Sequence, residues 1–295
     1  MPLSRRFLLA GCAGLLATPA FAAGKVTVAF AGSMGMVMDR GLGPAFSART
    51  GTQFQGIGQA AMALAHLLAG KALSADVFVS VSAAPVRVVE AAGLAARAAP
   101  FASTQMVLAY APGSAFAARF AQAGADWRQI LATPGLRFGR TDPAADPQGQ
   151  YVLYALQLAE AYYQLPGFAA RVAGAVENPA QIFTEPSLLA RLRDGQIDAT
   201  LTYKSAAVSQ QLPFIELPPE INLSDPALAK GWYSRAALAL HGRTLHPGPL
   251  VFYAAVLKNA PNPAAAAAFA AFLGSAAGQA ILARDGYGPG MGQNI

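Results

Sequence analysis

The sequence predicts an α/β protein in which helices cover largely parallel sheets. Short apolar runs rich in β-branched residues alternate along the chain with segments of helical periodicity, and this alternation is typical of α/β layers. The chain is 54% hydrophobic and only 12% charged, so it can bury a large core. About 270 residues remain beyond the N-terminal segment described below, a length that suits two modest domains.

Strands and helices are predicted in turn from these patterns. The strands are expected at residues 26–31, 75–80, 106–110 and 197–203, and the helices at 61–68, 85–98, 126–131 and 187–193. Later, Asn262 and Pro263 fit the N-cap and first position of an alanine-rich helix that runs to Phe272 and is closed by Gly274. The Pro/Gly-rich stretch 242–249 is expected to be a loop.

The first 22 residues have the features of an export signal. Arg5 and Arg6 precede an uncharged apolar stretch that ends in an Ala-Phe-Ala cleavage pattern at residues 20–22. We expect residues 1–22 to be a twin-arginine signal peptide and the mature protein to be periplasmic and soluble. The alternative is a membrane anchor, for which the stretch is short and contains Pro19.

Cys12 offers a second alternative, because the Leu-Ala-Gly-Cys run at residues 9–12 matches the bacterial lipobox, in which the cysteine carries a lipid anchor. The cysteine comes early, and the apolar run continues beyond it, which favours soluble export. Cys12 is the only cysteine. A chain cleaved after residue 22 therefore has no disulfide, no cysteine–metal site and no thiol nucleophile.

The charge of the mature chain is mildly positive. Removing residues 1–22 takes away two arginines and no acid, which leaves 19 Lys+Arg against 15 Asp+Glu and a net charge of +4. These charges are scattered, and the sequence has no basic run that would follow a phosphate backbone, so nucleic acid is not an expected partner. A weak attraction for small anions remains.

Two places in the sequence are suited to binding an anion. Gly32 and Ser33 follow the first predicted strand, where it turns into a helix, and helix N-termini present unpaired N–H groups to anions. Ser33 adds a hydroxyl donor. Asp146 and Pro147 read as the N-cap and first residue of another helix.

Three segments carry a family resemblance: VTVAFAGSM from residue 26, DPAADPQGQY from residue 142 and TYKS from residue 202. They resemble the motifs AGS, DPxGY and YKS of the periplasmic molybdate/tungstate-binding proteins of ABC importers. The resemblance implies a type II periplasmic binding fold, with lobe 1 at residues 23–106 and 246–295 and lobe 2 at 107–245. A ligand cleft would lie between the lobes, and segments 101–110 and 250–257 would form the two hinge crossovers.

The resemblance further implies a monomeric carrier of an oxyanion, molybdate or tungstate, that delivers its cargo to an ABC permease and needs no cofactor. Asp146 could bind the metal centre of the oxyanion; otherwise its charge would oppose the anion unless it points away. The ligand-binding residues implied by the motifs are Gly32, Ser33, Ala61, Asp146, Gly149, Thr202 and Tyr203.

Three departures from the family pattern leave the ligand open. Archaeal relatives have a glutamate where this chain has Thr202, and the family's second serine corresponds to Ala61. Tyr151 takes the position of an arginine or aromatic residue. The alternatives are the same fold with another oxyanion or a small organic anion, and a docking or signalling module with a degenerate cleft.

An enzymatic role finds no support in the sequence. The three histidines, His66, His241 and His246, have no paired metal-ligand spacing, and no Gly-x-Ser-x-Gly run is present. Asp142 and Asp146 read as turn and cap residues rather than as an acid/base pair. We therefore expect a binding protein, with a hydrolase as the least favoured reading.

Overall fold

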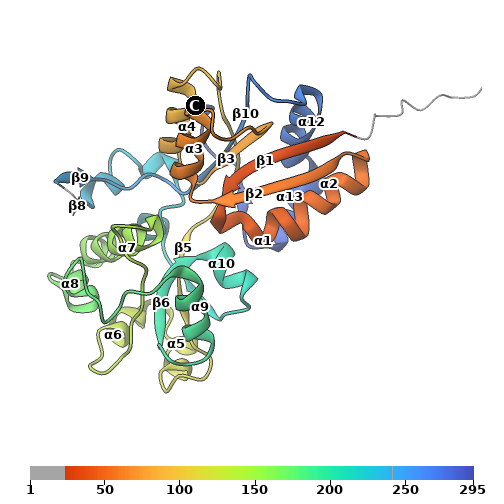
Figure 1. Ribbon diagram of the computed structural model, residues 1–295. Helices are drawn as coiled ribbons and strands as arrows, with labels where there is room; N and C mark the ends of the chain where they lie inside the picture. Colours follow the sequence, from red (N-terminus) through yellow and green to blue (C-terminus); the bar gives the residue numbers. More distant parts are fainter. Residues whose placement is uncertain (1–23, 241) are drawn as a thin grey trace, which may run out of the picture.

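The computed structural model describes residues 24–240 and 242–295, and in it the chain forms two α/β lobes (Figure 1). Each lobe is built on its own sheet, and the chain passes from one lobe to the other twice. This arrangement confirms the predicted two-lobed fold class. The predicted export signal, Cys12 and His241 lie outside the described residues.

Lobe 1 contains a six-stranded sheet in the order β11-β4-β10-β3-β1-β2. In it β1 runs parallel to β2 and β3, whereas β10 runs antiparallel to β3 and β4. The predictions of strands at 26–31 and 75–80 are confirmed. The strands are β1 (Lys25–Ala31), β2 (Gln53–Gln59), β3 (Val77–Ser80), β4 (Ala99–Ser103), β10 (Val251–Val256) and β11 (Gly288–Pro289).

Helices cover both faces of this sheet. The side chains of Val28 and Phe30 pack on one face against Phe269, and Ala29 and Phe78 pack on the other against a separate cluster. The predicted caps of α12 are confirmed, since the Asn262 side chain accepts a bond from Ala265 N–H and Gly274 is the C-cap. The helices are α3 (Ala61–Ala69), α4 (Ala83–Ala91), α12 (Pro263–Leu273) and α13 (Ala276–Arg284).

A further helical run of lobe 1 follows β1 without a break. It consists of η1 (Gly32–Met34), α1 (Gly35–Val37), the π-helical turn η2 (Met38–Leu42) and α2 (Gly43–Thr50). The Gly43 N–H bonds to the Met38 carbonyl, five residues back. The next residue, Pro44, has no N–H to continue the α-helical ladder, which accounts for the wider turn at this point.

Lobe 2 contains a three-stranded sheet in the order β6-β5-β7, with β5 (Met106–Tyr110) at its centre. Both β6 (Ala199–Tyr203) and β7 (Phe214–Glu216) run antiparallel to β5. The expectation of largely parallel sheets is therefore wrong in this lobe. Alternation of strand and helix in the sequence does not reveal whether the chain returns to a sheet from the same end or the opposite one.

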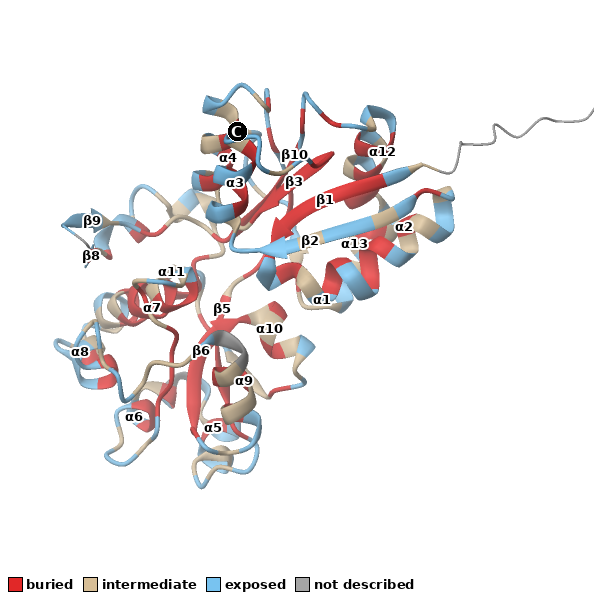
Figure 2. Ribbon diagram, in the orientation of Figure 1, coloured by how far each residue is buried: buried red, intermediate tan, exposed pale blue. Residues whose placement is uncertain are grey.

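The helices of lobe 2 surround this sheet, and Figure 2 shows β5 and β6 buried between them, whereas β2 is exposed on the edge of lobe 1. A β-hairpin, β8 (Leu238–Leu240) and β9 (Arg243–Leu245), occupies part of the stretch expected to be a loop. The helices are α5 (Ala117–Gln122), α6 (Trp127–Leu131), α7 (Pro147–Tyr163), α8 (Phe168–Ala173), α9 (Glu185–Arg193), α10 (Lys204–Ser209) and α11 (Pro219–Asn222).

The two crossovers between the lobes lie side by side. The chain leaves lobe 1 at Thr104 and returns through Leu250, and the Thr104 N–H donates to the Leu250 carbonyl at 3.0 Å. A third contact joins the lobes at Gly286, where φ is +83°: a Cβ there would lie 2.8 Å from Cγ2 of Val208 in α10. The lobes are therefore held together at one side of the molecule.

Within the described part of the chain, no single helix is long and apolar enough to cross a membrane; α12 and α13 meet that test only as a pair, bent by 59°.

Candidate functional site

Lobe 1 brings three of the predicted ligand residues together. Ala31 of β1 is in register with Gln59 of β2, so the turn at Gly32–Ser33 lies beside the start of α3 at Ala61. A Cβ on Gly32 would be 3.7 Å from the Gln59 carbonyl. Neither η1 nor α3 has a side-chain cap among the described residues, so their first-turn N–H groups are donors that an anion can use.

The side chains at these two turns differ. Gly32 and Ser33 are exposed, and Ser33 adds its hydroxyl to the backbone donors. Ala61 is half-buried and offers only its backbone N–H. Lobe 1 therefore presents a surface made chiefly of main-chain donors.

Tyr287 supports the Ser33 turn and was not predicted from the sequence. Its hydroxyl donates to the Ser33 carbonyl at 3.4 Å, and its ring packs edge-on against Phe252 with centroids 5.3 Å apart. Tyr287 is 254 residues from Ser33 in sequence, so no local pattern links the two.

On lobe 2, Asp146 is the N-cap of α7, as predicted. Its Oδ1 accepts a hydrogen bond from Gln148 N–H at 2.9 Å, and Pro147 occupies the first turn. Burial raises the pKa of Asp146; hydrogen bonding to Gln148 N–H and Thr141 partly opposes this rise, and nearby Asp142 adds to it. The carboxylate is thus incompletely compensated by the protein.

Gln148 and Gly149 fix the position of that cap. The Gln148 side chain is buried and accepts bonds from Thr141 N–H (3.2 Å) and Oγ1 (2.8 Å), and its Nε2 donates to the Leu201 carbonyl at 2.7 Å. A Cβ on Gly149 would lie 2.4 Å from the Thr141 carbonyl oxygen. Gly149 is therefore buried against main chain, and its contact with a ligand stays a prediction.

Tyr203 ends β6 next to the start of α7. Its ring lies edge-on to that of Tyr151 at a centroid separation of 6.3 Å, and the Tyr151 hydroxyl donates to the Gly248 carbonyl at 3.2 Å. Burial raises the pKa of Tyr151, so its hydroxyl stays protonated. This pair joins α7 and β6 to the second crossover.

Thr202 points to the other face of β6. It pairs with Val107 of β5, which packs with Leu188 of α9, whereas Tyr203 packs on the α7 side. Thr202 is 0% exposed, and its hydroxyl has no hydrogen-bond partner among the described residues. The structure does not bring Thr202 to the side of Tyr203, and its role as a ligand residue stays a prediction.

Two pockets lie between the lobes. The larger, of about 500 Å³, is lined by Gly32, Ser33 and Met36 of lobe 1 and by α10 of lobe 2. The smaller, of about 250 Å³, lies at the crossovers and is lined by Thr104, Lys204 and neighbouring residues. Neither includes Ala61, Asp146 or Tyr203, so in this conformation the two halves of the predicted site do not share these pockets.

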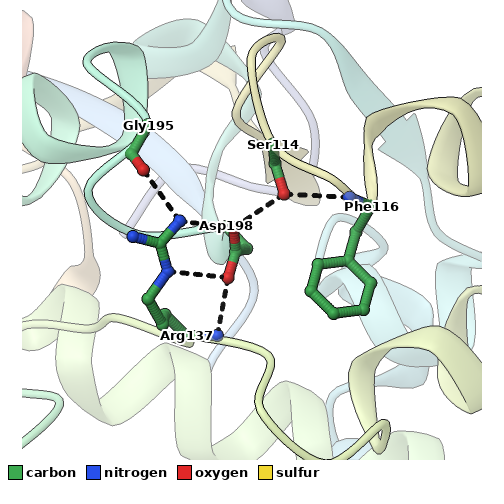
Figure 3. Close-up of polar contacts among 5 residues, drawn as sticks. All are labelled: Ser114, Phe116, Arg137, Gly195 and Asp198. Atoms are coloured by element: carbon green, nitrogen blue, oxygen red, sulfur yellow. Dashed lines mark hydrogen bonds and ion pairs between the residues drawn. The ribbon is translucent and has the colours of Figure 1, made fainter.

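Lobe 2 also contains an ion-pair network around Asp198 (Figure 3). Asp198 accepts bonds from Arg137 at 2.7 and 3.0 Å and from the Ser114 hydroxyl at 2.7 Å. Burial raises the pKa of Asp198, but these bonds outweigh that effect and lower it. Asp198 precedes β6, and Tyr203, the last residue of that strand, is five positions further on, about 16 Å along the strand. The network is structural.

No group of three or more His, Cys, Asp or Glu side chains that could hold a metal ion occurs among the residues described. The chemistry available is therefore that of hydrogen-bond donors, one half-buried carboxylate and two tyrosines. Two lobes joined by adjacent crossovers, with the uncapped Gly32–Ser33 turn lining a pocket between them, define a solute-binding protein. The chain belongs to the bacterial extracellular solute-binding protein family, whose sequence profile matches residues 26–288.

Similar proteins include a putative ABC transporter molybdenum-binding protein from Haloferax volcanii, 35% identical over 178 residues, which are 60% of this chain and 56% of that protein. A molybdate/tungstate-binding protein from Pyrococcus abyssi is 31% identical over 203 residues, 62% of this chain and 59% of that one. This chain thus spans less than two thirds of the length of these relatives.

A solved structure with the same fold is the substrate-binding domain of a putative molybdenum ABC transporter from Clostridium difficile. It superimposes with a TM-score of 0.63 at 16% identity and covers 90% of this chain and 99% of that one. At this identity the likeness shows the fold alone.

Proposed function

We propose that this protein captures a tetrahedral oxyanion, molybdate or tungstate, and delivers it to the permease of an ABC importer. The observation that carries the proposal is the pair of uncapped turns at Gly32–Ser33 and Ala60–Ala61, held next to each other by the β1–β2 register. Main-chain N–H groups and a hydroxyl stabilise a dianion without the cost of burying a counter-charge. The names of the relatives from Haloferax and Pyrococcus support this ligand class.

Capture follows from closure of the lobes about the two crossovers. We take the moving bodies to be residues 23–106 with 246–295, and residues 107–245. The anion first binds the lobe 1 turns, and closure then brings Asp146 and Tyr203 to it from lobe 2. Since the anion contacts both lobes only when they are shut, it shifts the population towards the closed form.

The half-buried Asp146 fits an anion with a large metal centre. A carboxylate oxygen repels sulfate or phosphate oxygens, but it can add to the coordination of molybdenum or tungsten. The protein itself carries out no reaction in this proposal. It acts as a monomer and binds, orients and releases its cargo.

The compartment follows from the N-terminal sequence. We propose that the Arg5–Arg6 pair directs the chain through the twin-arginine route to the periplasm, where the permease is met. Replacing both arginines with lysine should leave the precursor in the cytoplasm. Normal export of that double variant would contradict this route.

Calorimetric titration and thermal unfolding with molybdate, tungstate, sulfate and phosphate test the ligand. A ligand that binds only the native state adds about 2.7 kcal/mol to the unfolding free energy at 100 times its dissociation constant. We expect molybdate and tungstate to raise the melting temperature at concentrations where sulfate does not. Absence of any shift at millimolar molybdate and tungstate would overturn the proposal.

A second candidate is the same capture mechanism with another oxyanion or a small organic anion. It is favoured by Ala61, which has no hydroxyl, and by Thr202, which lies on the far side of β6 from Tyr203. At both positions the side-chain group that the family resemblance implies for binding molybdate or tungstate is missing from the site. Tighter binding of phosphate or sulfate in the same titration would select this candidate.

A further inference from the structure

One face of the helical run after β1 lines the larger pocket. Ser33, Met36, Val37 and Arg40 all line it, and their spacing of i, i+3, i+4 and i+7 places them in one stripe along the helix. The stripe begins with a hydroxyl, continues with two apolar side chains and ends with a cation. Figure 1 shows α1 of lobe 1 facing α10 of lobe 2 at this place.

The opposite wall of the pocket carries no charge. It is formed by Leu189 of α9 and by residues of α10 and its end, including Ser205, Val208 and Gln210. The wall therefore offers hydroxyl and amide groups together with apolar surface. It provides no carboxylate to pair with a cation from lobe 1.

The cation at the end of the stripe has no ion-pair partner among the described residues. Arg40 is exposed and makes no hydrogen bond or ion pair with any residue in the described ranges. Arg284 and Asp285 also line the pocket, and Arg284 Nη2 and Asp285 Oδ2 would be 3.7 and 3.5 Å from a Cβ on Gly41, which places both near the Arg40 end. Among the described residues the ion pair of Arg284 is with the neighbouring Asp285, at 3.4 Å. The two arginines and Asp285 leave this end with a net charge of +1.

The middle of the stripe leaves apolar surface uncovered. Met36 is 45% exposed, the highest value among the large hydrophobic side chains described.

A guanidinium with free donors is suited to a carboxylate, which it can bind with two parallel hydrogen bonds. Uncovered apolar surface between two anion-binding ends is suited to a short hydrocarbon chain.

We infer that the cleft accepts a small organic dianion: a tetrahedral oxyanion head at the Gly32–Ser33 turn, a short aliphatic spacer along Met36 and Val37, and a carboxylate at Arg40. This inference rests on the proposed function, because the head group occupies the proposed oxyanion site. The pocket of about 500 Å³ is within the range of organic-ligand sites, about 300–1,000 Å³.

The length of the stripe limits the spacer to a few carbons. Seven residues rise about 10 Å in an α-helix, the intermediate geometry of this run of 3-10, α and π turns. Long side chains on a helix lean towards its N-terminus, so we expect the Arg40 guanidinium to lie back towards Ser33. A chain of two or three methylene groups fits this separation.

Two matched probes test the inference by calorimetry. 3-Phosphonopropionate carries a tetrahedral phosphonate, a two-methylene spacer and a carboxylate, and propylphosphonate has a methyl group in place of the carboxylate. We expect the parent protein to bind 3-phosphonopropionate at least tenfold more tightly. Arg40→Gln should bring the two affinities within about twofold of each other, and Arg49→Gln, an exposed arginine of α2 outside the pocket, should keep the parent's ratio.

Equal affinities for the two probes in the parent would overturn the inference, as would a preference that survives in Arg40→Gln. Because Arg40 makes no bond within the described chain, the variant should unfold at the parent's temperature, which excludes misfolding as the cause. Titration of the parent with molybdate reports separately on the proposed function. Failure there with success for 3-phosphonopropionate would reject the metal oxyanion and keep the organic dianion.

Discussion

The two lobes present their halves of the candidate site in different ways. Lobe 1 offers main-chain N–H groups at two exposed turns, with Ser33 as the side-chain donor. Lobe 2 positions Asp146 through a buried network in which Gln148 bonds to Thr141 and to the Leu201 carbonyl. Main-chain donors do not depend on side-chain identity, so lobe 1 can accept alanine at position 61. Lobe 2 depends on specific side chains, so we expect it to tolerate fewer substitutions at its half of the site.

The two lobes also differ in net charge. Residues 24–104 and 251–295, which carry the six-stranded sheet, contain 8 Lys+Arg and 4 Asp+Glu, whereas residues 105–250 contain 11 of each. The net charge of +4 therefore belongs to lobe 1. On the proposed function, an approaching anion would be attracted to the lobe with the exposed donors before lobe 2 closes on it.

The largest expected effect is on stability. It comes from replacing one glycine in each lobe with alanine and comparing the two variants. Gly149→Ala places a Cβ 2.4 Å from a main-chain oxygen and should lower the unfolding free energy by about 3 kcal/mol. Gly32→Ala meets nothing closer than 3.7 Å and should stay within about 0.5 kcal/mol of the parent. Urea denaturation measures both, and equal losses would break the contrast between the lobes.

Ser33→Ala should lower affinity and leave folding nearly unchanged. It removes a hydroxyl donor to a charged ligand, a loss of about 1.5–3 kcal/mol, or roughly ten- to a hundredfold in the dissociation constant. Calorimetry with tungstate measures the change. Ser234→Ala, on the exposed surface of lobe 2, is the matched control and should bind like the parent. Parent-like affinity in Ser33→Ala would place the ligand elsewhere.

Asp146→Asn should produce a stability difference that depends on pH. Burial raises the pKa of Asp146, so the native state binds this proton more tightly than the unfolded state, and ionisation weakens the native state as pH rises through the folded pKa. Asparagine is also a good N-cap and carries no charge. The variant should therefore gain relative to the parent at pH 7 and lose that gain near pH 4. A larger stability gain at pH 4 than at pH 7 would contradict a raised pKa of Asp146 in the native state.

The smallest effect is expected at the buried hydroxyl of lobe 2. Thr202→Val replaces a buried hydroxyl that has no partner in the described part of the chain with a methyl group of similar size, so the unfolding free energy should stay the same or rise by at most about 1 kcal/mol. Tungstate affinity should not change if the hydroxyl takes no part in binding. A loss of affinity would show that closure recruits Thr202.

Local sequence signals correctly predicted the helices whose first residues include a capping side chain and a proline. The Asp146–Pro147 and Asn262–Pro263 pairs marked the starts of α7 and α12, because a capping side chain and a proline at the first turn are read within three residues. The turn from β1 into Gly32–Ser33 was predicted from a different local signal, the apolar β-rich run that precedes it. The two-lobed fold came from the motifs.

Elements that depend on distant partners could not be predicted. The strand β2, QFQGIGQ, has no apolar pattern because it is the exposed edge of the sheet, and its Gly56 and Gly58 lie where the Phe30 ring leaves no room for a Cβ. The role of Gly149 depends on Thr141, and the support of Ser33 comes from Tyr287. The family motif identified Thr202 as the residue at this position, but it did not show which face of β6 the Thr202 side chain occupies.

The bond between Thr104 and Leu250 has a topological consequence. Since these residues are joined at 3.0 Å, everything between them leaves and re-enters at a single point. All six described strands of the larger sheet lie outside residues 105–250, so that sheet is complete without the inserted stretch. The second lobe is an insertion at one point of the first, so recombination at this junction should exchange the side-chain half of the proposed site and keep the main-chain half.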